Sequence, residues 1–229
     1  MKRRLTLLLL LMLTLLPVQA LAEGVYESNM ILVNKKYGLP QNYVPSDLTP
    51  ANVTFAEGVA ESKKQMRAEA AKALEDMFAA AMEDGIELLG ISGYRSYYTQ
   101  KKIYEKRLEE AGEWHVSRYN AKPGHSEHQT GLAMDVGVEG YTDLTERFAN
   151  TPAYRWLKKN AHLYGFIIRY PENGEEETGY AFEPWHVRFV GEEAAAIKES
   201  GLTMEDYVEY KLRRMSFMER LPRLYERAE

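Results

Sequence analysis

The sequence predicts a single α+β domain in which a small antiparallel sheet is flanked by helices. Stretches with helical and strand patterns alternate along the chain, but without the regular spacing of βαβ units. The last three predicted strands follow one another too closely for crossover helices, which favours antiparallel pairing. No internal repeat and no flexible linker divides the sequence, so one domain is expected.

The N-terminus has the pattern of a secretory signal peptide. Three basic residues precede the apolar run 5–16, which is shorter than the roughly 20 residues that a membrane-spanning helix needs. Small residues at Ala20 and Ala22 offer a cleavage site before Glu23. We therefore expect residues 1–22 to be removed, leaving an exported chain without a transmembrane span, located outside the cell, in the cell wall or in the periplasm. An uncleaved N-terminal anchor is the alternative.

The composition of the mature chain excludes several classes of protein. Without the three basic residues of the predicted signal peptide, 26 basic residues face 34 acidic ones, a formal charge of about −8. This charge argues against a nucleic-acid-binding protein, because contacts to phosphates depend on basic residues. The sequence has no cysteine, which excludes disulfides, thiol nucleophiles and thiolate metal ligands. Its chemistry must use histidines, carboxylates, hydroxyls or a metal ion.

An extended N-terminal strap is predicted for residues 23–55. Pro40 and Pro45 prevent a continuous helix there, and the segment reads as extended chain over the surface. Residues 56–229 then form the main domain, which is long enough to fold around one core without disulfides.

The first half of the main domain is predicted as helix, strand and helix. Residues 62–84 have apolar positions at helical spacing, and Gly85 is placed to end the helix. The compact apolar run 86–92 predicts a buried strand. Helical spacing returns in residues 97–111, which Gly112 closes.

The second half begins with a predicted loop at residues 113–130, where periodicity is weak, and a strand at 132–138. Thr151 and Pro152 form a good cap and first turn for a helix that Gly165 ends. Two further strands are predicted at residues 166–170 and 180–190, with an acidic loop at 171–179 between them. Two C-terminal helices are predicted at residues 192–200 and 204–215.

Two histidines and an aspartate form the candidate metal site. His128 and Asp135 lie seven residues apart in the segment S-E-H-Q-T-G-L-A-M-D, where a loop runs into a strand. His186 stands at the start of another apolar strand that could pair beside the first. A zinc ion held by two histidines and one carboxylate keeps its fourth position for water, as catalytic sites require. Glu183, three residues before His186, is close enough to reach such a water without binding the metal.

Spacing alone leaves the first histidine undecided. His125 lies three residues before His128 and is its main rival as a ligand. A single histidine is more often an ordinary surface or core residue than a ligand, and Asp135 alone would more often cap a strand. The separate residues therefore give only a weak indication of a metal site.

Longer motifs give a stronger indication. They occur in order along nearly the whole mature chain, and they read I-L-V-N-K, S-G-Y-R-S-Y-Y-T-Q, G-H-S-E-H-Q-T-G-L-A-M-D, G-F-I-I-R-Y-P and E-P-W-H-V-R-F-V-G. In these motifs the sequence resembles the VanY-type D-alanyl-D-alanine carboxypeptidases and the related L,D-carboxypeptidases, which are zinc enzymes of peptidoglycan maturation. The resemblance implies a fold of the zinc DD-peptidase type, with residues 56–229 as the catalytic domain.

The resemblance also implies a role for each candidate residue. It makes His128, Asp135 and His186 the ligands of Zn²⁺, and it leaves His125 as a loop residue or as a residue that supports the ligands from outside. Catalysis and substrate binding are implied for four further residues, with Glu183 as the catalytic base, Arg95 as the guanidinium that steadies the oxyanion, and Ser126 and Gln100 as contacts to the terminal carboxylate or peptide of the substrate.

The expected function is removal of the C-terminal D-alanine from peptidoglycan stem peptides, with D,D-carboxypeptidase activity slightly favoured. An L,D-carboxypeptidase acting on tetrapeptide stems is the nearest alternative, and an endopeptidase acting within cross-links is a third. A non-catalytic wall-binding module of the same fold is the alternative from another class, although it would have no use for the carboxylate of Glu183 beside the metal. The sequence does not predict the oligomeric state.

Overall fold

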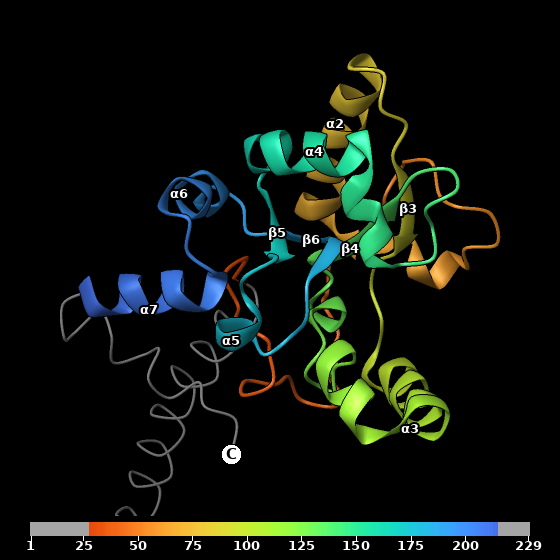
Figure 1. Cartoon of the computed structure of the whole chain (residues 1–229), viewed down its shortest axis with the longest axis vertical. Coiled ribbons are helices and arrows are strands. Elements are labelled where there is room, and N and C mark those ends of the chain that lie inside the picture. The colour runs from red at the N-terminus through yellow and green to blue at the C-terminus, as the bar shows by residue number, and fades with distance from the viewer. Residues whose placement is uncertain (1–27, 215–229) are drawn as a thin grey trace, which may run out of the picture.

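The computed structural model describes residues 28–214 (Figure 1). The predicted signal peptide and Met215, the expected end of the last helix, lie outside the described residues. Among the helices in the described range, none is long and apolar enough to cross a membrane.

The elements follow the predicted alternation of helices and strands. The six strands of the described range are β1 (Leu48–Pro50), β2 (Gln65–Arg67), β3 (Leu89–Ser92), β4 (Ala133–Gly137), β5 (Phe166–Tyr170) and β6 (Glu183–Phe189). The α-helices are α2 (Ala68–Glu83), α3 (Tyr97–Tyr119), α4 (Pro152–Asn160), α5 (Glu175–Thr178), α6 (Glu193–Ser200) and α7 (Met204–Arg214). Four short 3₁₀ helices join them, η1 (Glu61–Lys63), η2 (Glu127–Thr130), η3 (Glu146–Asn150) and η4 (Ala161–Tyr164).

The main sheet has four strands in the order β3-β4-β6-β5, and every neighbouring pair is antiparallel. This confirms the predicted fold class. The predicted strand 166–170 is β5 residue for residue. A second, two-stranded antiparallel sheet joins β1, at the end of the strap, to β2.

Side-chain alternation gives the main sheet an apolar face and a polar face. Met134 of β4 pairs with Val187 of β6, and both belong to the main hydrophobic core together with buried residues of α2 and α4. Asp135 and His186 pair one position along, so they project from the opposite face. Helices α2 and α4 lie together on one side of the sheet, and α3 lies on the other (Figure 1). The apolar face forms the core and leaves the polar face for a site.

The start of the first long helix was wrongly predicted. Helix α2 begins at Ala68, because η1 occupies residues 61–63, β2 occupies residues 65–67, and β2 pairs with β1. Met66 is the one apolar residue of this segment, and its place four residues before Ala70 fits the helical spacing, so the strand was hidden. Pairing with a distant strand, which local spacing cannot reveal, decided the boundary.

The predicted end of the next helix, at residue 111, was also wrong. Gly112, with a φ of 76°, interrupts α3, but the helix resumes and continues to Tyr119. In this second segment Val116 alone is buried, which explains why the periodicity of the predicted loop 113–130 is weak. Two shorter helical segments, η2 and α5, also occupy parts of predicted loops.

The predicted cap of α4 is confirmed. Thr151 Oγ1 accepts a hydrogen bond from the backbone N–H of Tyr154 at 3.2 Å and donates one to the carbonyl of Phe148 at 2.7 Å. Since Thr151 is buried, Thr151→Ala leaves both groups without this partner, and we expect the free energy of unfolding to fall by about 1 kcal/mol in urea titrations. The matched control is Thr142→Ala at an exposed position, which should change stability by less than about 0.5 kcal/mol. Equal losses in the two variants would contradict the capping role.

Candidate metal centre and catalytic cleft

The two histidines and the aspartate of the candidate metal site lie together, although they come from three elements. His128 belongs to η2, Asp135 to β4 and His186 to β6. One potential ligand atom of each residue lies within 4.8 Å of the other two, and all three residues are buried. The register of β4 and β6 places Asp135 directly opposite His186. The turn before β4 then supplies His128.

His128 presents a lone pair to Asp135. Its Nδ1 lies 2.8 Å from the carbonyl oxygen of Gly93, which can only accept, so Nδ1 carries the ring hydrogen. Its Nε2 lies 3.3 Å from Oδ2 of Asp135. Burial, together with the nearby Arg95, lowers the pKa of His128 to about 4, which keeps the ring neutral at neutral pH. A lone pair and a carboxylate oxygen that face each other at this distance are suited to share a cation.

His186 approaches Asp135 from the other side. Its Nδ1 lies 3.1 Å from Oδ1 of Asp135, and its Nε2 lies 3.2 Å from Oε2 of Glu127. Burial alone would raise the pKa of Asp135, but His128 and His186 hold it well below its ordinary value, so the carboxylate stays ionised. Two imidazole nitrogens and one carboxylate oxygen are a donor set that fits catalytic zinc.

Glu183 stands beside this group. Strict alternation would put residues 183 and 186 on opposite faces of β6, but the pairing of β5 with β6 shifts register between Ile168 and Tyr170, opposite this stretch. Oε2 of Glu183 consequently lies 3.9 Å from Nδ1 of His186. Burial raises the pKa of Glu183 to about 8, and the opposing effect of His186 is smaller. A carboxyl group with a pKa near neutrality is suited to accept and return a proton.

A cleft of about 730 Å³ opens over these residues, and Arg95 and Ser126 line it as well. Nη1 of Arg95 lies 3.3 Å from Oγ of Ser92 and 3.8 Å from Oδ2 of Asp135. The buried Nε of Arg95 has no hydrogen-bond partner within the described range. A buried donor without a partner beside a cleft is a position where a ligand oxygen can bind.

Gln100 and His125 lie away from this group. Nε2 of Gln100 donates to the carbonyl of Ala121 at 2.8 Å, and Gln100 is not among the residues found to line the cleft in the described part of the chain. Nδ1 of His125 lies 2.7 Å from the carbonyl oxygen of Asn34 in the strap. The geometry therefore favours His128 over His125 as a ligand, and it gives Gln100 a contact that supports the loop before η2.

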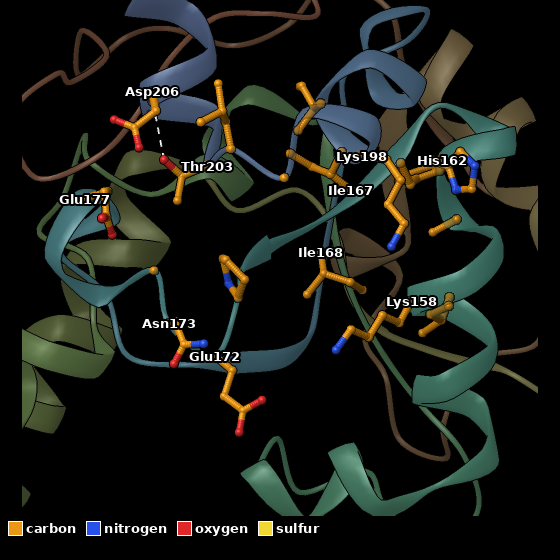
Figure 2. Close-up of a pocket in the computed structure, with 18 of the residues that line it drawn as sticks. Lys158, His162, Ile167, Ile168, Glu172, Asn173, Glu177, Lys198, Thr203 and Asp206 are labelled. Carbon is orange, nitrogen blue, oxygen red and sulfur yellow. Dashed lines mark hydrogen bonds between the residues drawn. The ribbon is translucent and has the colours of Figure 1, made fainter.

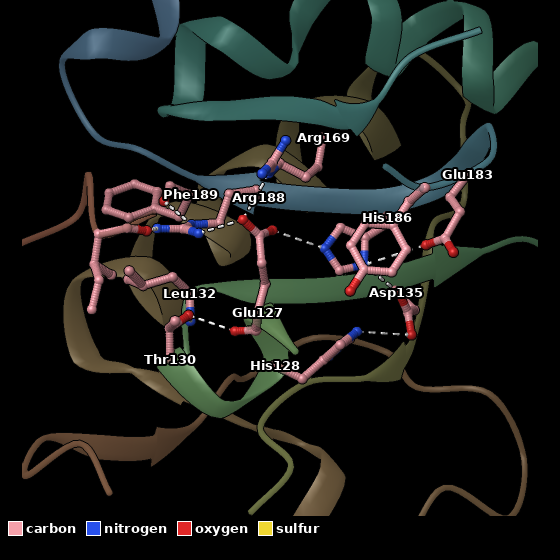
Figure 3. Close-up of polar contacts among 12 residues, drawn as sticks. Glu127, His128, Thr130, Leu132, Asp135, Arg169, Glu183, His186, Arg188 and Phe189 are labelled. Atoms are coloured by element: carbon pink, nitrogen blue, oxygen red, sulfur yellow. Dashed lines mark hydrogen bonds and ion pairs between the residues drawn. The ribbon is translucent and has the colours of Figure 1, made fainter. Parts of the chain in front are cut away.

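Sequence reasoning missed three buried charged residues behind the metal group, Glu127, Arg169 and Arg188. Glu127 lies between the two arginines and His186 (Figure 3). The arginines stand in the otherwise apolar strands F-I-I-R-Y and E-P-W-H-V-R-F. A fully buried arginine requires a buried partner, but the strand pattern alone does not show that these arginines are buried.

A second hollow, of about 430 Å³, lies between β5, α4, α6 and the start of α7 (Figure 2). Its walls include the charged side chains of Lys158, Lys198, Glu172 and Asp206. Among the described residues, the group of potential metal ligands is that of His128, Asp135 and His186, which lines the other cleft. The candidate active site is therefore the larger cleft.

An antiparallel sheet that carries a buried His-Asp-His group beside a carboxyl of raised pKa is the arrangement of a metal-dependent hydrolase. A family model described as VanY, D-alanyl-D-alanine carboxypeptidase, matches residues 63–192. The chain belongs to this VanY family of carboxypeptidases.

Individual relatives agree with the family. The putative carboxypeptidase YodJ of Bacillus subtilis is 48% identical over 186 residues, which cover 80% of this chain and 68% of YodJ. The solved structure of the LdcB LD-carboxypeptidase matches with a TM-score of 0.74 and 47% identity, over 79% of this chain and 86% of LdcB. The vancomycin-resistance D,D-pentapeptidase VanY in complex with Zn(II) matches with a TM-score of 0.64 and 33% identity, over 79% of this chain and 98% of that one.

Proposed function

We propose that this chain is an exported zinc carboxypeptidase that hydrolyses the C-terminal D-alanine from peptidoglycan stem peptides. The observation that carries the proposal is the convergence of His128, Asp135 and His186 within 4.8 Å, with Glu183 beside them in the lining of a cleft. The VanY relative that binds Zn(II) supports zinc as the metal. A module that only binds the cell wall would not need Glu183 in this position.

The mechanism assigns one task to each side chain. His128, Asp135 and His186 would hold a zinc ion, which when bound would supply a water of lowered pKa and polarise the scissile carbonyl. Glu183 accepts a proton from the attacking water and returns it to the departing amine, which breaks the peptide bond and releases the terminal amino acid. Arg95 pairs with the negative charge that develops on the carbonyl oxygen.

Because the protein is acidic overall, binding of the free C-terminal carboxylate of a substrate requires local hydrogen-bond donors. Arg95 and Ser126 line the cleft and can donate to the terminal carboxylate or the adjoining peptide group. Gln100 was expected to share this task, and in the described structure its amide instead holds the carbonyl of Ala121. Its buried Oε1 has no hydrogen-bond partner among the described residues, so a role for Gln100 in holding the substrate stays a prediction.

A second candidate, L,D-carboxypeptidase activity on tetrapeptide stems, is favoured by one observation. The LdcB LD-carboxypeptidase shares 47% identity with this chain, against 33% for the D,D-pentapeptidase VanY. Both activities release D-alanine and use the same chemistry, but they cut different bonds. The choice therefore depends on the length of the stem that fits the cleft.

We expect the purified protein to release D-alanine from defined stems, to lose this activity with a zinc chelator and to regain it when zinc is added. Mass spectrometry of tripeptide, tetrapeptide and pentapeptide stems after incubation identifies the bond that is cut. Release from the pentapeptide indicates D,D activity, and release from the tetrapeptide indicates L,D activity. Release that persists in the chelator would contradict the metal mechanism, and binding of stems without release would support the binding module.

A further inference from the structure

Glu127 is a fully buried carboxylate with both oxygens engaged. Its Oε1 accepts hydrogen bonds from Nε of Arg169 at 2.7 Å and from Nη1 of Arg188 at 2.6 Å. Its Oε2 lies 3.2 Å from Nε2 of His186 (Figure 3). The side chains of Glu127, Arg169 and Arg188 have no exposed surface. The carboxylate therefore cannot turn away from His186 without breaking both ion pairs.

Further hydrogen bonds hold the two arginines in place. Arg169 donates to both oxygens of Glu205 in α7, at 2.8 Å and 2.6 Å. Arg188 donates to the backbone carbonyls of Asn29 and Ile31, at 3.0 Å and 2.8 Å. We call Glu127, Arg169, Arg188 and Glu205 the Glu127 cluster. Its two positive and two negative charges balance, which makes the burial of a charged Glu127 tolerable.

The charge state of Glu127 decides what it can do to His186. Two guanidinium groups, which can only donate, point at Oε1 of Glu127 at 2.7 Å and 2.6 Å, and this pairing with two positive charges keeps the carboxylate ionised. An ionised carboxylate has no hydrogen and only accepts. A His186 ring that binds a metal keeps only one of its two possible hydrogens, and the contact with Glu127 requires this hydrogen on Nε2. The lone pair is then on Nδ1, the atom that faces Asp135 and Glu183.

We propose that Glu127 is a positioning residue, which accepts the Nε2 hydrogen of His186 and thereby presents Nδ1 of this ring to the metal. The proposal deepens the proposed function and rests on it. The carbonyl of Gly93 does the same for His128 with the opposite geometry, because it accepts from Nδ1 and leaves Nε2 for the metal. The two histidines are thus held in opposite tautomers by two acceptors of different kinds. Partners of this type typically contribute a factor of about 10 to 100 to metal affinity.

Glu127→Gln is the variant that tests the proposal. The amide oxygen of the variant would face the two arginines, because both arginines donate hydrogen bonds and the amide NH₂ cannot accept them. The NH₂ group would then point at His186 and donate to Nε2, which favours the ring hydrogen on Nδ1 and blocks the ligand atom. We expect zinc to bind about 10 to 100 times more weakly, as measured by competition with a chromophoric chelator.

Glu205→Gln is the matched control. It weakens the ion pair on the other side of the same Arg169 but does not touch His186. Both variants should lower the stability of the metal-free chain in urea titrations, whereas Glu205→Gln should keep zinc affinity within about threefold of wild type. Equal losses of zinc affinity in both variants would show that affinity follows stability alone, and would overturn the proposal.

Two further results separate this proposal from the proposed function. A wild-type chain that binds no zinc would overturn both, whereas wild-type binding that Glu127→Gln leaves unchanged would overturn the positioning role alone. If Glu127→Gln does not fold, ¹⁵N NMR of the zinc-loaded wild-type chain decides. We expect the hydrogen of His186 on Nε2 and that of His128 on Nδ1, and a hydrogen on Nδ1 of His186 would overturn the proposal.

Discussion

Glu183→Gln should lower kcat by a factor of about 10² to 10⁴, while the protein retains its zinc. The variant keeps the size and hydrogen-bonding shape of the side chain but cannot accept and return a proton, and general acid–base catalysis is typically worth this factor. Zinc should stay, because the proposed ligands are His128, Asp135 and His186, and Glu183 is not one of them. Stopped assays of D-alanine release, together with metal analysis of the same samples, measure both quantities.

Stability measurements separate this result from simple unfolding. A buried acid whose pKa is raised to about 8 disfavours the folded metal-free protein as pH rises above the unfolded pKa near 4.5. Glu183→Gln removes this cost, so the metal-free variant should be at least as stable as wild type at pH 7. Glu176→Gln, at an exposed position of α5, is the control and should leave both activity and stability unchanged. An active Glu183→Gln would contradict its role as base, and loss of zinc would make Glu183 a ligand instead.

The candidate metal group was predicted chiefly from the resemblance of its motifs, because spacing alone left His128 and His125 as rival ligands. His128 and Asp135 belong to one continuous turn and strand, and the apolar strand after His186 indicated a neighbour in the same sheet. Once β4 and β6 pair, a register that puts Met134 and Val187 in the core also puts Asp135 and His186 together on the other face. Hydrophobic burial and ligand placement are fixed by the same register.

The Glu127 cluster could not be predicted in this way. Glu127 meets Arg169 and Arg188 across 42 and 61 residues of sequence, and only the assembled sheet brings them together. In a strand pattern, an arginine between apolar residues reads as a solvent-facing position. In the folded protein the strap and α7 cover that face, since the carbonyl of Ile31 binds Arg188 and the carboxylate of Glu205 binds Arg169. Both arginines are therefore buried.

The second segment of α3 was missed for a related reason. It extends past Gly112, and its residues His115 and Tyr119 line the cleft rather than the core. A helix with few buried residues has little apolar periodicity. Elements that build the walls of a site are for this reason harder to predict than those that build the core.

Arg95→Met should lower kcat by a factor of about 10² to 10³ and change KM much less. The side chain of Arg95 is mostly buried, lies 3.8 Å from Asp135, and has a buried Nε without a partner in the described structure. A donor fixed in this way before the substrate arrives stabilises charge that appears only in the transition state. Steady-state kinetics on the stem that the protein cleaves give both constants, and metal analysis verifies that zinc remains bound.

Arg107→Met is the matched control, because Arg107 lines the same cleft but is exposed and pairs with Glu110 at 3.3 Å. We expect it to change either constant by less than about threefold. Arg95→Lys keeps the charge without the planar guanidinium, so an intermediate kcat would show that geometry contributes as well as charge. The opposite pattern for Arg95→Met, a raised KM with kcat unchanged, would assign Arg95 to the terminal carboxylate of the substrate instead of the oxyanion. Because that carboxylate carries its charge throughout the reaction and the oxyanion does not, the division between KM and kcat distinguishes the two roles.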